Sequence, residues 1–213
     1  MGFSPPLPPP HLTPFLLPLP PPPTIHRSLP TNFPFTGITK DPEQLIKRKD
    51  LPGWSVDRKR VKVGTGADAY KKAMDAVLAW KNFDFDWFFT NNPPVRPNEP
   101  VVVTAQTLFL WSVLPLKVTW IEKDGAPRDA KQKETIKRRM AFGHATLEGH
   151  QLSGEEAFAV ELHKNDDVWY ELTTVSRPAS LLSVLSLPML RFFQLKFMNQ
   201  SMDAVKKAAN ASK

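Results

Sequence analysis

Four residues between positions 150 and 177 carry side chains that can act together on a bound molecule. They are His150, Glu155, Glu156 and Arg177. Neighbouring residues of a β-strand point to opposite faces of a sheet, so only one of the two glutamates can face inward. We favour an interpretation in which Arg177 and a glutamate form a bidentate ion pair that closes the sheet edge. The alternative is a polar patch at a cavity mouth that orients the polar end of a ligand.

Other histidine and serine residues do not complete a known catalytic or metal-binding set. His144 and His150 are six positions apart, which matches no standard zinc spacing. Ser153 and Ser176 can be grouped with His150 for hydrolysis, but the chain has no Gly-x-Ser-x-Gly nucleophile motif. The absence of cysteine excludes disulfides, thiolate metal sites and cysteine nucleophiles. We therefore expect no catalytic residues, no bound metal, no cofactor and no enzymatic activity.

Two further patterns are better explained by structure than by chemistry. Gly64 and Gly66 lack the third glycine of a dinucleotide fingerprint, and no Gly-Lys-Ser/Thr of a P-loop follows them. We expect a turn from a strand into a helix at this position. Asp84 and Asp86 are two positions apart and would face the same side of a strand. We expect them to be solvent-exposed carboxylates rather than an acid–base pair.

Three short strands must position the polar patch. Apolar and β-branched residues at 142–147, 157–163 and 168–175 predict these strands. A glycine-rich turn joins the first two, and a four-residue polar connection joins the last two as a hairpin. Pro178 ends the third strand because proline has no N–H for the ladder.

The rest of the chain predicts further strands and a helix around this unit. Apolar residues recur at helical spacing in 67–81, where we expect an amphipathic helix. The apolar segment 108–115 is expected to form a cavity wall or a surface that meets lipid or a partner. The basic segment 123–139 is expected to be an exposed, mobile loop. Further strands are predicted at 58–63, 83–89, 101–107 and 116–122.

The last predicted element is a long amphipathic helix that begins near Pro188, a residue that suits a first helical turn. We expect it to run for about 20 residues, or roughly 30 Å. Its wide apolar face must lie across something large, most simply the concave face of the sheet. The predicted stripe consists of Leu195, Met198, Met202, Val205 and Ala209.

Composition limits the classes of partner. The chain has 213 residues, 41% of them hydrophobic, and a net charge of +7, which is compatible with one domain, a tail and an anionic partner. No nucleic-acid-binding motif accompanies the scattered basic residues, so we expect no nucleic acid. No apolar run reaches the length of a membrane-spanning helix. The basic clusters at 47–49 and 58–60 are interpreted as a solvated loop and a strand edge, with anionic lipid headgroups as the alternative partner.

Residues 1–34 differ in composition from the rest of the chain. They hold 13 of the 23 prolines, and no acidic residue occurs before Asp41. Such a segment favours extended polyproline conformations and cannot form a core. We expect a disordered proline-rich tail, and a single domain over 35–210. A plastid transit peptide and a docking site for a proline-recognising module are alternative functions of the tail.

Several motifs resemble the family of unknown function called DUF1990, over roughly residues 33–209. They are the segment 63–66 with a following helix that ends in a tryptophan, the segments 143–150, 154–158, 168–171 and 176–178, and a glutamine in the closing helix. One departure is His144-Ala145, where the family has Tyr-Gly. The residues that match the family motifs are Gly64, Gly66, Trp80, Gly143, Thr146, Leu147, Gly149, Gly154, Phe158, Ser176, Pro178 and Gln194.

The resemblance implies a fold and suggests two functions. The order of elements resembles the START-like, helix-grip proteins, so we predict an α+β fold in which a curved antiparallel sheet grips a long C-terminal helix. The resemblance implies a non-enzymatic module that binds an apolar small molecule or lipid. Plant members are similar to chloroplast outer-envelope proteins, so a chloroplast location is expected, with the cytoplasm as the alternative. The second function implied in this way is an oligomeric cation-channel subunit.

Overall fold

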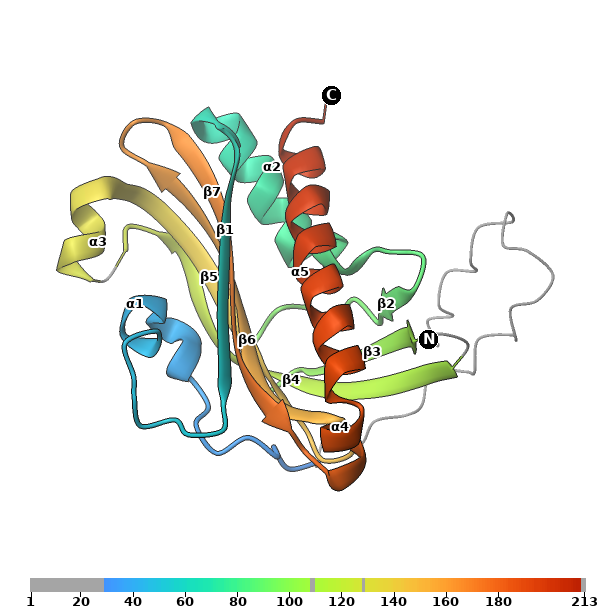
Figure 1. Ribbon diagram of the computed structural model, residues 1–213. Helices are drawn as coiled ribbons and strands as arrows, with labels where there is room; N and C mark the ends of the chain where they lie inside the picture. Colours follow the sequence, from blue (N-terminus) through green and yellow to red (C-terminus); the bar gives the residue numbers. More distant parts are fainter. Residues whose placement is uncertain (1–28, 108–109, 128, 212–213) are drawn as a thin grey trace.

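A strongly curved antiparallel sheet forms the body of the protein. The computed structural model describes residues 29–107, 110–127 and 129–211. The seven strands lie in the order β1-β7-β6-β5-β4-β3-β2, and the sheet curls around the two longest helices (Figure 1). The strands are β1 (Ser55–Thr65), β2 (Phe88–Thr90), β3 (Pro100–Thr107), β4 (Leu110–Gly125), β5 (Ile136–Thr146), β6 (Leu152–His163) and β7 (Asp167–Pro178).

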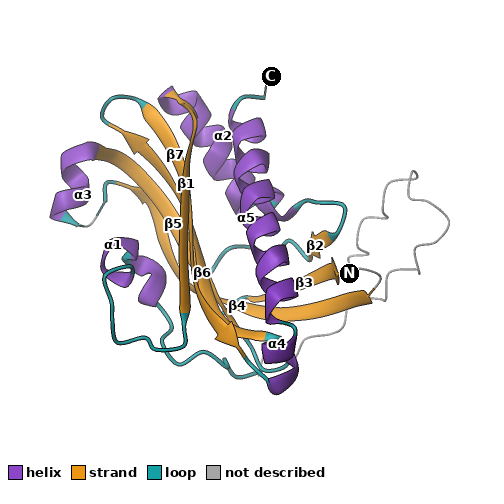
Figure 2. Cartoon of the chain, viewed as in Figure 1, coloured by secondary structure: helices purple, strands orange, loops and turns teal. Residues whose placement is uncertain are grey.

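Two long helices fill the concave face (Figure 2), while the short helix α1 lies on the convex side, where its Leu45 packs with Val175. The helix α5 crosses the sheet, and α2 packs beside its C-terminal half. This arrangement confirms the predicted helix-grip fold. The helices are α1 (Pro42–Leu45), α2 (Gly66–Leu78), α3 (Ala130–Thr135), α4 (Leu181–Leu185) and α5 (Leu187–Ala209), with short 3-10 turns at Ile38–Lys40 and Lys81–Phe83.

Hairpin register decides which side chains face the helices. In β5, β6 and β7, Phe142 pairs with Phe158 and Phe158 with Leu172, and all three are buried beneath the helices. Because every second residue of a strand faces the same side, Glu156 and Thr174 lie on this concave face as well. Glu155 therefore lies on the convex face. The predicted strands 142–147, 157–163 and 168–175 are all confirmed, each longer than expected at one or both ends.

The helix α5 has the expected start, length and apolar stripe. Pro188 lies in its first turn, and Lys206 and Lys207 occupy its last turn, where cations interact favourably with the helix dipole. Four of the five predicted stripe residues are buried against the sheet and α2. The fifth, Leu195, is 38% exposed, so this part of the prediction was wrong. Its buried residues all lie between Phe197 and Ala209.

Two predicted segments differ from the structure. The pattern at 83–89 predicts a strand, but only Phe88–Thr90 pairs with β3, because Lys81–Phe83 is a 3-10 turn and an isolated bridge between Phe85 and Phe88 closes a tight turn. Asp84 and Asp86 are nevertheless exposed, as predicted. The segment 123–139 is not an open loop. It contains α3, and Arg139 is buried because it pairs with Glu122 and Glu161 on the convex face.

The first described residues lie against the sheet. Asn32 N–H donates to the Thr146 carbonyl at 3.2 Å, and Phe33 is buried with Leu45 and Val175 on the convex side. The chain is therefore packed before residue 35, where the domain was expected to begin. The proline-rich tail lies mostly outside the described residues.

Candidate functional site

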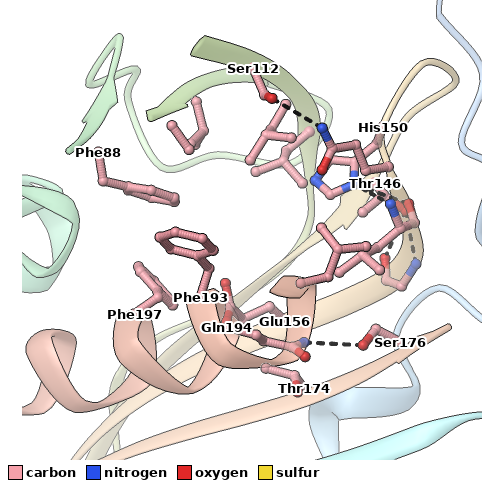
Figure 3. Close-up of a pocket in the computed structure, with 18 of the residues that line it drawn as sticks. Phe88, Ser112, Thr146, His150, Glu156, Thr174, Ser176, Phe193, Gln194 and Phe197 are labelled. Carbon is pink, nitrogen blue, oxygen red and sulfur yellow. Dashed lines mark hydrogen bonds between the residues drawn. The ribbon is translucent and has the colours of Figure 1, made fainter. Parts of the chain in front are cut away.

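A partly open pocket of about 150 Å³ lies between the concave face and the N-terminal half of α5. Phe193, Gln194 and Phe197 project into it from α5, facing Phe88 and the strands (Figure 3). Most of the wall is apolar and aromatic. The polar residues of the lining are Thr107, Ser112, His144, Thr146, His150, Gln151, Glu155, Glu156, Thr174, Ser176 and Gln194.

The sheet brings His144, Glu156 and Thr174 into one row across three strands. The register pairs His144 with Glu156 and Glu156 with Thr174. His144 Nε2 lies 3.1 Å from Glu156 Oε2. The His144 ring also lies parallel to Trp80 at 6.1 Å and edge-on to Phe158 at 5.4 Å. A carboxylate and aromatic rings thus fix the orientation of this imidazole.

In the described part of the chain, two atoms of this row have no hydrogen-bond partner. They are His144 Nδ1 and Thr174 Oγ1, on side chains that are only 2% and 3% exposed. Leaving a buried polar atom unpaired costs about 1–3 kcal/mol, so such atoms need a reason. Both residues line the pocket. The row can therefore offer hydrogen bonds to a molecule that enters the pocket.

The rim of the pocket ties α5 to the sheet through Gln194. Gln194 Nε2 donates to Ser176 Oγ at 3.1 Å on β7, as Figure 3 shows. Gln194 Oε1 accepts from Arg191 Nη1 at 2.7 Å, and Arg191 in turn donates to Asp57 on β1. These hydrogen bonds thus hold the first turns of α5 over the pocket.

His150 forms another part of the wall and is neutral near pH 7. His150 Nδ1 lies 2.9 Å from the Leu152 backbone nitrogen and 3.0 Å from the Leu152 carbonyl oxygen, so the backbone of Leu152 fixes the orientation of the ring. Burial lowers the pKa of His150 to about 4, and the neighbouring His144 lowers it further, against the Leu152 backbone, which raises it. At physiological pH this imidazole therefore presents no charge to the pocket.

The structure separates the four residues of the predicted polar patch. His150 and the Glu156 side chain are at the pocket. The Glu155 carboxylate lies on the convex face, where it accepts from Gly37 N–H at 2.7 Å, from Thr39 and from Thr119 Oγ1. Arg177 is exposed and lies 4.5 Å from the centre of the Trp54 ring.

The family-motif residues divide between the pocket and the scaffold. Four of them, Thr146, Gly154, Ser176 and Gln194, line the pocket. Gly64, Gly66 and Gly149 lie at turns or element ends, and the last two have positive φ angles. The others are in the core or in strands: Trp80, Gly143, Leu147, Phe158 and Pro178.

Sequence reasoning did not identify His144 and Thr174 as pocket residues. His144 was weighed only as a metal ligand and as a departure from a family motif. Counting by twos from Phe142 and from Leu172 would have placed both on the concave face, and hairpin register would have placed both beside Glu156. The aromatic wall from α5 had a helical-spacing signal, in Phe193 and Phe197.

The described ranges contain neither a cluster of metal ligands nor a membrane-spanning helix. Within residues 29–107, 110–127 and 129–211, no three histidine, cysteine or acidic side chains cluster as ligands for a metal ion. No helix in the same ranges is both long enough and apolar enough to cross a membrane.

Comparison with known proteins identifies relatives over most of the chain. The model of the family described as Domain of unknown function (DUF1990) matches residues 41–204. A UPF0548 protein of Arabidopsis thaliana is 35% identical over 164 residues, which cover 76% of this chain and 77% of the relative. A UPF0548 protein of Dictyostelium discoideum is 30% identical over 168 residues, which cover 75% and 74%.

Solved structures are similar at low sequence identity. The Zhui aromatase/cyclase of a Streptomyces species is 14% identical, with a TM-score of 0.48, and covers 73% of this chain and 93% of its own. Norcoclaurine synthase from Thalictrum flavum, in complex with dopamine and hydroxybenzaldehyde, is 13% identical, with a TM-score of 0.44 and coverage of 75% and 90%. At these TM-scores the likeness carries no information about function.

Proposed function

This chain belongs to the DUF1990 family, and we propose that it binds a small apolar molecule with one hydrogen-bonding group in the pocket beneath the first half of α5. The proposal rests on the combination of an aromatic wall and a short polar row. Such a combination is typical of small-molecule sites, where apolar contacts give affinity and a few polar groups fix orientation.

The size of the pocket favours a single ring or a branched chain end. A dry cavity of about 150 Å³ with apolar walls is known to hold a molecule the size of benzene. Phe88, Phe193 and Phe197 present ring surfaces from two sides, which suits a flat apolar group. Because the pocket is partly open, the remainder of a longer molecule can extend outward.

The unpaired atoms His144 Nδ1 and Thr174 Oγ1 are the observation that carries the proposal. An imidazole nitrogen and a hydroxyl can each pair with a hydroxyl or carbonyl oxygen of a ligand. An isolated ionised group would be costly to bury here, since the wall is mainly apolar. We therefore favour a neutral alcohol, phenol or ketone.

Phenol and toluene test this directly, because they have similar size and differ in one hydroxyl. Titration followed by NMR should show saturable binding of both, with phenol bound at least about fivefold more tightly through one added hydrogen bond. Thr174→Val should remove most of this difference, and Thr173→Val, on the opposite face, should keep it. Absence of saturable binding by both probes, or an unchanged preference in Thr174→Val, would contradict the proposal.

The proposal extends to a chloroplast location, which the resemblance to plant family members and the acid-free stretch before Asp41 support. A fluorescent fusion of the full chain, compared with one that begins at Leu29, tests it. The alternative of an oligomeric cation-channel subunit stays a prediction from the resemblance. Conductance of the purified protein in planar bilayers is its test.

A further inference from the structure

In the short helix α4, the polar residue is buried and the apolar residues are exposed, the opposite of an ordinary surface helix. Ser183, its one polar residue, is buried, and its backbone N–H donates to Ser180 Oγ at 3.2 Å, while the two hydroxyl oxygens are 2.9 Å apart. The other four residues, Leu181, Leu182, Val184 and Leu185, are between 52% and 76% exposed. Contiguous exposed apolar side chains of this size are unusual on a soluble surface and indicate an interaction site.

The apolar surface continues onto the first turns of α5. Phe192 is 63% exposed, and Leu195 follows one turn later on the same side of the helix. Figure 1 shows α4 at one end of the molecule, directly before α5. We call this surface the α4 patch and define it by Leu181, Leu182, Val184, Leu185, Phe192 and Leu195.

Positive charge accompanies the α4 patch. No acidic residue occurs from position 172 to position 202, whereas Arg177, Arg191 and Lys196 fall in this stretch. Arg191 is neutralised by Asp57 of β1. In the described part of the chain, neither Arg177 nor Lys196 makes an ion pair. Instead they lie over the rings of Trp54 and Trp87, 4.5 Å from each centre. Lys196 follows Phe192 by one turn of α5, so an apolar surface in a stretch without acidic residues, with a cation beside it, complements an apolar layer with anionic headgroups.

We propose that the α4 patch docks on a lipid bilayer that carries anionic headgroups, and that the pocket exchanges its ligand across α5. The second half of this statement rests on the proposed function. On α5, Leu190, Phe193 and Phe197 line the pocket, while Phe192 and Leu195 belong to the patch. One stretch of helix therefore separates the pocket from the docked surface, and an apolar ligand need cross little water.

A second copy of the chain fits the α4 patch less well than a bilayer does. A symmetric dimer would bring the same patch of both protomers together. Each protomer would then bring the same basic, acid-free stretch to the interface, and like charges at an interface are unfavourable. A bilayer with anionic headgroups has the opposite charge.

Vesicle flotation with the full chain tests the proposal. We expect the protein to float with vesicles that contain phosphatidylglycerol, more weakly with pure phosphatidylcholine, and less in high salt. The double variant Leu182→Ser/Leu185→Ser should bind at least about tenfold more weakly. Ile46→Ser is the matched control, since Ile46 is also an exposed aliphatic residue and follows α1, outside the patch. It should float like the wild type.

The outcomes separate this inference from the proposed function. Phenol binding by the double variant, measured without vesicles, should be unchanged, which also shows that the variant is folded. Equal flotation of the wild type and the double variant would overturn the docking surface while leaving the pocket intact. A concentration-dependent dimer that the double variant disperses, without vesicle binding by the wild type, would overturn it in favour of a second copy.

Discussion

The two halves of α5 meet the same sheet in different ways. In the C-terminal half, Met198, Met202, Val205 and Ala209 are buried against α2 and the strands, and the interface is closed. In the N-terminal half, the helix lies over the pocket, and one side of it is exposed apolar surface. The closed half supplies stability, and the open half leaves room for a ligand.

Buried hydroxyl groups show the same contrast. In the closed half, the Tyr170 hydroxyl and Ser201 Oγ are 2.8 Å apart, and the Tyr70 hydroxyl donates to Asp124 Oδ1 at 2.7 Å. In the open half, Thr174 Oγ1 has no partner among the described residues. A fold that pairs some buried hydroxyls and leaves another unpaired beside a pocket separates the groups that stabilise it from the group that we propose binds a ligand.

The largest expected effect is a loss of stability confined to the closed half. Met198→Ala should lower the free energy of unfolding by about 2–5 kcal/mol, because Met198 is fully buried and the cavity cannot refill. Urea unfolding followed by circular dichroism measures this loss.

Leu190→Ala is the matched change in the open half. Leu190 is half-buried at the pocket wall. Leu190→Ala should therefore lower the free energy of unfolding by at least about 1 kcal/mol less than Met198→Ala does. Equal losses in the two variants would mean that both halves are packed alike, and the comparison would fail.

Lowering the pH should reduce the free energy of unfolding, because His150 in the open half becomes protonated when the protein unfolds. Its pKa falls from 6.5 to about 4 on folding, so the unfolded state binds more protons between these values. Stability is then complete above about pH 6.5 and is lost as the pH falls toward about 4, by on the order of 3 kcal/mol.

His150→Gln should flatten this acid-side slope, measured as the free energy of unfolding at a series of pH values. The closed half should respond to base instead, because burial raises the pKa of Tyr170 and of Tyr70 above the ordinary value of 10. Both contributions are complete below pH 10 and are lost above it. A slope in His150→Gln that equals the wild-type slope would refute the assignment.

The closed half and the strands were predictable from the sequence, while the shape of the open half was not. Helical spacing identifies the stripe from Met198 to Ala209 because one continuous contact imposes it. The same spacing wrongly includes Leu195, since periodicity does not record where a helix lifts away from its support. A pocket forms where the side chains of the helix and the sheet do not meet, and the periodicity of apolar residues does not record this.

The candidate site was predictable to the extent that strand alternation controls it. Alternation correctly requires that Glu155 and Glu156 point to opposite faces. It does not say that Glu155 would be held by Gly37 and Thr39, which are more than a hundred residues away in the sequence. Arg177 lies over Trp54 for the same reason: the partner comes from a loop whose path depends on tertiary packing.

Gly64 gives a smaller test of the closed half. A Cβ at this position would lie 2.7 Å from the Cβ of Ala69 and 3.9 Å from that of Ala209, where α2 and α5 meet β1. Gly64→Ala should therefore cost about 1–3 kcal/mol by overpacking. Thermal unfolding measures this cost. Combination with Ala69→Gly should recover most of it, and no recovery would show that the strain lies elsewhere.

The smallest expected change in the free energy of unfolding comes from removing one buried hydroxyl group in each half. It distinguishes the two halves well, because the change should have a different sign in each. Ser201→Ala should lower the free energy of unfolding by about 1–2 kcal/mol, since it leaves the buried Tyr170 hydroxyl with one partner fewer. Thr174→Val removes a hydroxyl that has no partner and keeps the shape of the side chain, so it should be neutral or stabilise by up to about 1 kcal/mol.

Urea unfolding of both variants, without ligand, tests the pair. If Thr174→Val destabilises the protein as much as Ser201→Ala does, the Thr174 hydroxyl has a structural role, and the distinction between paired and unpaired hydroxyls no longer identifies the binding site. If Thr174→Val is neutral or stabilising and also loses the preference for phenol, the hydroxyl contributes nothing to folding and serves the ligand instead.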